Sequence, residues 1–131
     1  MIFRYTILYV DDVAASIDFF TRAFSLEKGF VHEGGDYGEL ATGHTKLAFS
    51  STSLMRQLGK DPARPSRRQP CFEIALETDD VAGALRRALA AGAVLEKDVQ
   101  EMPWGQTLAY VSDPNGYLIE ICSPVQLPSP G

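Results

Sequence analysis

The stretch Asp-Asp-Val-Ala-Ala at residues 11–15 returns as Asp-Asp-Val-Ala-Gly at residues 79–83, 68 positions later. The surrounding sequence repeats too: a run of alternating apolar residues precedes each copy, and an amphipathic segment follows it. Self-similarity at a fixed offset is the signature of a duplicated structural unit. The sequence therefore predicts two copies of one module.

The first copy has the pattern of a strand, a helix and three further strands. Residues 2–10 are β-branched and aromatic, which favours a strand. Asp11 and Asp12 can cap the following helix, because a short carboxylate accepts hydrogen bonds from free amide groups at a helix start. Glycine-bearing turns separate three shorter strands, predicted at 30–33, 37–41 and 46–50. The apolar face of the helix is formed by residues spaced at four, three and four positions, namely Val13, Ile17, Phe20 and Phe24.

The second copy repeats this order over residues 71–123. A strand is predicted at 72–78, a helix at 80–91, and strands at 94–97, 107–112 and 117–122. Residues 52–70, between module 1 (1–51) and module 2, contain three prolines and collect basic residues, as expected of a linker. This basic segment is either a solvated loop or a contact for an anionic group. The tail 124–131 is proline-rich, and we expect one domain over 1–131.

Composition limits the partners. The 131 residues carry a net charge of -5, which argues against nucleic acid and anionic membranes, since both attract basic surfaces. No apolar run reaches the ~20 residues of a membrane span, and the start lacks the form of a secretion signal. We therefore expect a cytoplasmic protein whose ligand is cationic or neutral. Cys71 and Cys122 are expected to be reduced packing residues in strands.

Two segments carry a resemblance to a known family. They are Tyr-Val-Asp-Asp at 9–12, followed by Ser-Ile-Asp-Phe-Phe at 16–20, and Asp-Pro-Asn-Gly-Tyr-Leu-Ile-Glu at 113–120. With the twofold repeat, the chain resembles the vicinal oxygen chelate superfamily, which includes glyoxalase I, extradiol dioxygenases, fosfomycin resistance enzymes and bleomycin resistance proteins. The resemblance implies an α+β fold of two tandem βαβββ modules, whose curved sheets form a cup commonly completed by a second subunit. A homodimer is therefore expected.

Strand alternation predicts which side chains face that cup, because successive side chains point to opposite faces. In the last strand Glu120 lies on the face opposite Ile119 and Ile121. In the strand that opens the second module, Ile74 and Leu76 suit the core, which leaves Glu73 on the other face. The repeat then pairs Tyr5 with Glu73 and Ala48 with Glu120.

By resemblance, these four positions match the metal ligands of metal-dependent members, typically two histidine or glutamine and two glutamate side chains. Here Ala48 cannot bind a metal, and the Tyr5 phenol is a poor ligand near neutral pH. Glu73 and Glu120 alone would hold a hard, oxygen-seeking ion weakly. The sequence therefore favours a protein without a cofactor, with a divalent metal at Glu73 and Glu120 as the alternative.

The two glutamates also suggest acid–base chemistry. Glu73 could instead be an exposed strand residue paired with a lysine or arginine. Glu120 lies between apolar neighbours, where a charge needs a partner. If both converge in a desolvated site, their repulsion raises the pKa of one and creates an acid–base pair.

Aromatic residues complete the candidate ligand-binding set. Trp104 lies in a predicted loop, where an indole either caps a pocket or packs against the protein. Tyr5, Tyr9 and Tyr110 either line the cup or fill it. His32 and His44 fall in turns or strand ends, away from the ligand positions.

Two function hypotheses follow. The first is a metal-free small-molecule binder, similar to bleomycin resistance proteins, which sequesters a ligand in a cup at a dimer interface. The second is a glyoxalase- or dioxygenase-like enzyme, a metal-dependent lyase or oxidoreductase in which Glu120 moves a proton. No nucleophile triad or phosphate-binding glycine loop is present in the sequence. The missing histidines and Ala48 favour the binder.

Overall fold

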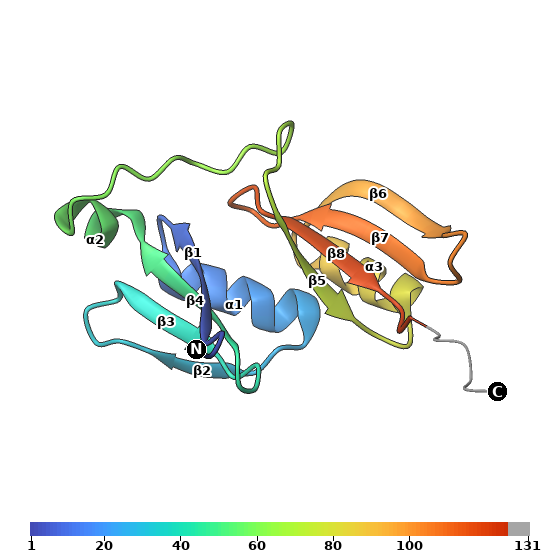
Figure 1. Ribbon diagram of the computed structural model, residues 1–131, viewed down its shortest axis with the longest axis horizontal. Coiled ribbons are helices and arrows are strands. Elements are labelled where there is room, and N and C mark those ends of the chain that lie inside the picture. Colours follow the sequence, from blue (N-terminus) through green and yellow to red (C-terminus); the bar gives the residue numbers. More distant parts are fainter. Residues whose placement is uncertain (126–131) are drawn as a thin grey trace. The chain divides into compact units, whose positions relative to one another are not determined.

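The computed structural model describes residues 1–125 and divides the chain into two compact units (Figure 1). Unit 1 comprises Met1–Arg64, and unit 2 begins at Pro65. The tail predicted for 124–131 lies outside the described residues from residue 126 onward. No helix within residues 1–125 combines the length and apolar character that crossing a bilayer requires.

Unit 1 is one four-stranded sheet with a long helix on one face (Figure 1). The strands follow the order β1-β4-β3-β2, with β1 parallel to β4 and the other pairs antiparallel. A short helix, α2, follows the last strand. The elements are β1 (Tyr5–Val10), α1 (Val13–Phe24), β2 (Lys28–Val31), β3 (Tyr37–Leu40), β4 (Lys46–Ser51) and α2 (Thr52–Gln57).

Unit 2 has the same topology, with strand order β5-β8-β7-β6 and β5 parallel to β8. Its elements are β5 (Glu73–Glu77), α3 (Val81–Ala90), β6 (Val94–Glu101), β7 (Thr107–Ser112) and β8 (Leu118–Cys122). The predicted α+β fold of two tandem βαβββ modules is confirmed.

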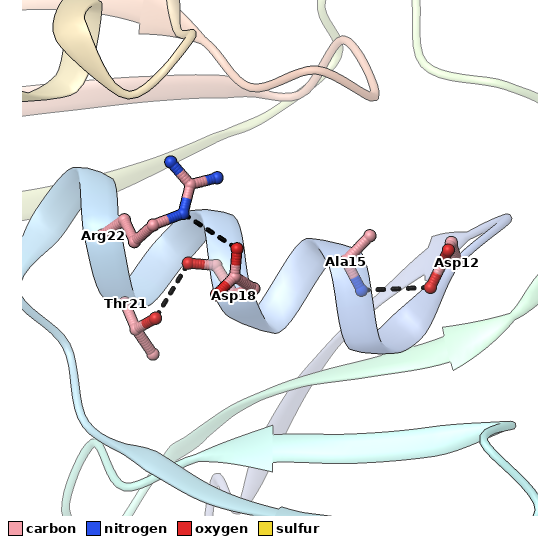
Figure 2. Close-up of polar contacts among 5 residues, drawn as sticks. All are labelled: Asp12, Ala15, Asp18, Thr21 and Arg22. Atoms are coloured by element: carbon pink, nitrogen blue, oxygen red, sulfur yellow. Dashed lines mark hydrogen bonds and ion pairs between the residues drawn. The ribbon is translucent and has the colours of Figure 1, made fainter.

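The repeated Asp-Asp-Val-Ala motif is a pair of helix caps. Asp12 Oδ1 accepts a hydrogen bond of 3.0 Å from the Ala15 amide at the start of α1 (Figure 2). Asp80 Oδ1 accepts one of 2.9 Å from the Gly83 amide at the start of α3. Each bond satisfies an amide that has no partner inside its helix. The duplicated motif therefore fixes where both helices begin.

Polar contacts also link turns further along α1. Arg22 Nε donates to Asp18 Oδ2 at 2.8 Å, and Thr21 Oγ1 donates to the Asp18 carbonyl at 2.8 Å (Figure 2). The charged pair has the i, i+4 spacing that places two side chains on neighbouring turns. It lies on the exposed side of the helix, so its contribution to stability is small.

The opposite side of α1 packs on the sheet. Phe20 is fully buried and its ring lies 5.2 Å from that of Phe49 in β4, measured between centroids. Gly38 of β3 lets the helix approach, since a Cβ there would lie 2.5 Å from Ile17 Cδ1. In unit 2 the buried face of α3, formed by Val81, Leu85 and Ala88, covers its sheet in the same way.

The turn between β7 and β8 is built around a buried carboxylate. Asp113 is 1% exposed, and its Oδ1 accepts hydrogen bonds from the amides of Gly116 at 2.9 Å and Tyr117 at 2.7 Å. Asn115 Nδ2 donates to Oδ2 at 2.8 Å. Gly116 has a φ of 107°, a conformation that glycine adopts without strain. Burial raises the pKa of Asp113, and these hydrogen bonds oppose that rise.

Three local expectations are corrected. The first strand begins at Tyr5 rather than at residue 2, because the backbone pairing with β4 begins there. The predicted linker starts with α2, whose first turn is capped by Ser51 Oγ accepting from the Leu54 amide at 3.0 Å. Cys122 is buried as expected, but Cys71 is exposed and precedes β5, so its assignment as a buried strand residue was wrong.

We expect Asp113→Ala to lower the free energy of unfolding by roughly 2–3 kcal/mol, because buried donors lose their acceptor. Chemical denaturation of the full chain measures the change. Asp79→Ala, at an exposed aspartate before α3, is the matched control and should change stability by less than ~0.5 kcal/mol. Equal losses in both variants would contradict a structural role for the turn.

Candidate functional site

Unit 2 places two carboxylates and a phenol together on the face of its sheet that points away from α3. We call this surface the open face of unit 2. Tyr110 of β7 lies directly opposite Glu120 of β8, which in turn lies opposite Ala75 of β5. Glu73 is two residues before Ala75, and is therefore the diagonal neighbour of Glu120. Ile119 and Ile121, which alternate with Glu120, are buried.

Hydrogen bonds join the three side chains into one cluster. Tyr110 Oη donates to Glu120 Oε2 at 3.2 Å. A hydrogen bond with Glu120 raises the pKa of Glu73 to about 7, with burial and the charge of Glu120 acting in the same direction. A hydrogen bond from Tyr110 opposes this rise. Near neutral pH, the two carboxyl groups therefore share a proton, and the titration belongs to the pair.

The phenol remains protonated as part of this cluster. Burial is the main cause that raises the pKa of Tyr110 to about 12, and the charges of Glu120 and Glu73 add to it. A protonated phenol can donate a hydrogen bond to the pair, while the shared proton can move to or from a bound molecule. The predicted convergence of Glu73 and Glu120 thus occurs within unit 2, and it includes Tyr110.

Unit 1 carries a different set on the corresponding face, which we call the open face of unit 1. Ala48 of β4 lies opposite Glu39 of β3, in the register that places Glu120 opposite Tyr110 in unit 2. The equivalence of Ala48 and Glu120, inferred from the repeat, is therefore seen in the strand pairing. Ala48 is fully buried and offers a methyl group where unit 2 has a carboxylate.

A second phenol–carboxylate pair lies beside Ala48. Tyr37 Oη donates to Glu39 Oε2 at 2.9 Å. Burial, followed by this hydrogen bond, raises the pKa of Tyr37 to about 12, and Tyr5 contributes a smaller electrostatic effect. Tyr37 and Glu39 were not among the site residues predicted from the sequence. Their signal was the i, i+2 spacing in a strand, which places both side chains on one face.

Tyr5 and Tyr9 also lie on the open face of unit 1, where β1 runs beside β4. Tyr5 is 49% exposed, and so is available to a ligand. Tyr9 is engaged by the segment after α2: Lys60 Nζ donates to its Oη at 3.0 Å and lies 5.3 Å from its ring centroid.

Two arginines of the basic segment, residues 52–70, form ion pairs, each within its own unit. Arg64 pairs with Asp11 at 2.7 Å, and Thr52 Oγ1 donates to the same carboxylate at 2.8 Å. These contacts, led by the Thr52 hydrogen bond, lower the pKa of Asp11. In unit 2, Arg67 pairs with Glu96 at 2.6 Å. Much of the segment's positive charge is therefore already paired with carboxylates of the protein.

Trp104 lies in the loop between β6 and β7 and is 55% exposed. Its indole Nε1, the single donor of that ring, bonds Gln106 Oε1 at 2.8 Å. Gln106 in turn donates to the Ser123 carbonyl at 3.0 Å. This chain of bonds fixes the indole against its own unit and leaves the ring surface exposed.

The donor set does not fit the metal site implied by the family resemblance. Unit 1 offers the Tyr5 phenol and the Ala48 methyl at the relevant positions, while the unit 2 carboxylates are hydrogen-bonded to each other. Within residues 1–125, no three His, Cys, Asp or Glu side chains form a group that could hold an ion. His32 and His44 are both exposed, His32 just beyond β2 and His44 in the turn before β4.

We expect Glu120→Gln to lower the pKa of Glu73 from about 7 toward its ordinary 4.5, because the neighbouring charge and shared proton are lost. Carbon-detected NMR of the side-chain carboxyl groups measures this titration. Glu77→Gln, at the far end of β5, is the control and should leave the Glu73 pKa near 7.

The same shift makes stability depend on pH. Because folding raises the Glu73 pKa, its contribution is present below pH 4.5 and is lost as the pH rises through about 7. Replacing Glu120 with Gln should flatten this part of the profile. An unchanged titration and an unchanged profile would show that the two carboxyl groups do not interact.

Comparisons with known proteins give consistent results. The profile of the family described as "Glyoxalase/Bleomycin resistance protein/Dioxygenase superfamily" matches residues 2–121. An uncharacterized protein of Mycobacterium bovis is 32% identical over 127 residues, which cover 91% of this chain and 81% of that protein.

Solved structures share the fold at lower identity. A glyoxalase-related enzyme from Fulvimarina pelagi has a TM-score of 0.80 and 23% identity, over 98% of this chain and 93% of that one. A glyoxalase/bleomycin resistance protein/dioxygenase family enzyme from Burkholderia phytofirmans has a TM-score of 0.79 and 19% identity, over 96% and 100% of the two chains. At these identities the likeness shows the fold alone.

Proposed function

Because the chain belongs to the Glyoxalase/Bleomycin resistance protein/Dioxygenase superfamily, we propose that it is a small-molecule binder of that superfamily with a degenerate metal site. Its role would be to sequester a ligand, in the manner of bleomycin resistance proteins. The observation that carries this proposal is the broken symmetry between the units. Ala48 offers a methyl group at the position where Glu120 offers a carboxylate.

Charge favours a cationic ligand. The chain has a net charge of -5, and the open face of unit 2 carries Glu73 and Glu120. A cation that approaches the pair would displace the shared proton and leave both carboxylates ionised. The rings of Tyr5, Tyr110 and Trp104 would add flat apolar surface for an aromatic ligand.

We also propose a homodimer, since members of this family commonly complete the ligand cup with a second subunit. Sedimentation velocity of the full chain is expected to give the mass of two chains. A monomer over the whole micromolar range would contradict the dimer and leave the binding proposal to be tested separately.

A second candidate function is an enzyme of the glyoxalase or dioxygenase type, a lyase or oxidoreductase in which Glu120 moves a proton. The observation that favours it is the Glu73 pKa of about 7, which suits a group that both gives and takes protons at neutral pH. Such members use a metal to polarise vicinal oxygens of the substrate. The binder ranks first because the donor set lacks residues for that metal.

Thermal denaturation of the purified chain tests the two candidates. We expect at least one compound in a panel of organic amines to raise the Tm, by roughly 10 °C at a hundred times its Kd. Glu120→Gln should reduce this shift, whereas Glu27→Gln, the same charge change at an exposed glutamate of unit 1, should retain it. Amines that shift both variants equally would contradict a role for Glu120.

Metal content is measured in parallel. We expect Mg²⁺, Mn²⁺, Ni²⁺ and Zn²⁺ to leave the Tm unchanged and elemental analysis to find less than stoichiometric metal, because Ala48 and Tyr5 supply no suitable ligands. A stoichiometric metal retained through purification, and lost in Glu120→Gln, would overturn the binder and support the enzyme.

A further inference from the structure

Three aromatic rings from β2, β3 and the residue after β2 gather on the open face of unit 1. We call Phe30, His32 and Tyr37 the aromatic cluster. The ring centroids are 5.5 Å apart for Phe30 and His32, 6.0 Å for His32 and Tyr37, and 6.1 Å for Phe30 and Tyr37. The rings are inclined to each other by 49–72°.

The cluster is accessible although it is apolar. Phe30 is 42% exposed and His32 is exposed, while Tyr37 is half-buried. β2 is an edge strand, so no strand of unit 1 lies beyond Phe30 in the sheet. Packing alone does not explain the cluster, because a ring that serves only the core is normally buried.

A carboxylate lies beside the rings. Glu39 is opposite Phe30 in the pairing of β2 with β3, and its Oε2 accepts the hydrogen bond from Tyr37 Oη at 2.9 Å. Lys46 shares the open face and, two residues before Ala48, is the diagonal neighbour of Glu39, but it forms no ion pair with it within 4.0 Å. Within residues 1–125 the ion pairs are Arg22–Asp18, Arg64–Asp11 and Arg67–Glu96, and none of them neutralises Glu39.

The spacing of the rings suits one cation. From the three centroid distances, the point equidistant from all three lies about 3.4 Å from each, so a cation about 4.5 Å above it is about 5.6 Å from every ring. For the rings of Phe30 and Tyr37, that distance is within the ~6 Å range of cation–π attraction. In the described part of the chain, the cation–π contact is Lys60 over Tyr9, so no side-chain cation covers the aromatic cluster.

We propose that the aromatic cluster and Glu39 form a binding site for an alkylated ammonium group, such as a quaternary amine. The ring faces attract the diffuse positive charge, and Glu39 supplies the opposite charge beside them. An anion would be repelled by Glu39 and by the net charge of -5. A neutral apolar group would gain contact with the rings and nothing from the carboxylate.

This site shares no residue with the cluster of Glu73, Tyr110 and Glu120. Its residues all belong to unit 1, whereas the acid–base pair belongs to unit 2. The inference therefore goes beyond the proposed function and can fail without it.

An NMR titration of the ¹⁵N-labelled full chain tests the proposal, with choline as the probe. 3,3-Dimethylbutan-1-ol is the neutral probe of the same shape, and sodium chloride controls for ionic strength. We expect choline to produce saturable amide shifts in residues 30–39, with a Kd in the roughly millimolar range. The neutral alcohol should bind at least ~5-fold more weakly.

Three variants test separately the charge of Glu39, the ring of Phe30 and the general effect of removing one negative charge. Glu39→Gln should weaken choline binding at least ~5-fold by removing the carboxylate charge, and Phe30→Leu should weaken it ~2- to 5-fold by removing one ring. Glu27→Gln makes the same charge change at an exposed glutamate just before β2, and should bind choline as the wild type does. Amide spectra verify that each variant is folded.

The outcomes distinguish this site from the proposed function. Equal binding of choline and the alcohol, or unchanged binding in Glu39→Gln, would overturn the ammonium site. Choline shifts confined to residues around Glu73 and Glu120 would also overturn it, while supporting a cationic ligand for unit 2. Saturable shifts at residues 30–39 that persist in Glu120→Gln would support the site independently of the acid–base pair.

Discussion

Each sheet is covered by a helix on one face only, and this constraint organises the rest of the structure. Side chains alternate along a strand, so every second residue must be apolar to pack under the helix. Phe49 and Ile119 meet this requirement in the two units. The residues that alternate with these buried positions point away from the helix, so they can be polar or charged. Ala48 and Glu120 occupy such positions, and this freedom lets the two units diverge without loss of the fold.

The divergence concerns where the carboxylates lie. In unit 2 they lie on β5 and β8, close enough to share a proton, with Tyr110 beside them. In unit 1 the carboxylate is Glu39 on β3, the strand next to β4, and Ala48 occupies the β4 position that corresponds to Glu120. A phenol–carboxylate hydrogen bond is present in both. The open faces are therefore related in architecture and different in charge.

Sequence reasoning was accurate where the physics is local. Of Asp11 and Asp12, the two caps predicted for the first helix, Asp12 is the cap; such a prediction is feasible because a cap acts within three residues of its helix start, whereas Asp11 instead bonds Thr52 and Arg64. The pairing of Ala48 with Glu120 followed from the repeat. Cys71 was misassigned because β5 begins at Glu73, two residues after the cysteine, which leaves the thiol exposed. The pair of Tyr37 and Glu39 was missed because its signal, an i, i+2 spacing in a strand, is shared by any two alternate residues of a strand.

By itself, the sequence determined the order of the strands and helices within the two repeated modules, the approximate starts of α1 and α3 and the residues that face each core, because these depend on periodicity and on short-range hydrogen bonds. The tertiary structure decided which side chains meet: Glu73 with Glu120, Tyr110 with Glu120, and Phe30 with Glu39. Those meetings depend on strand register and on β-bulges, such as the one between Lys28 and Phe30. The packing of distant segments also places Glu120 within hydrogen-bond reach of Glu73 and partly desolvates Glu73; the hydrogen bond first, and then the desolvation, raises the Glu73 pKa to about 7.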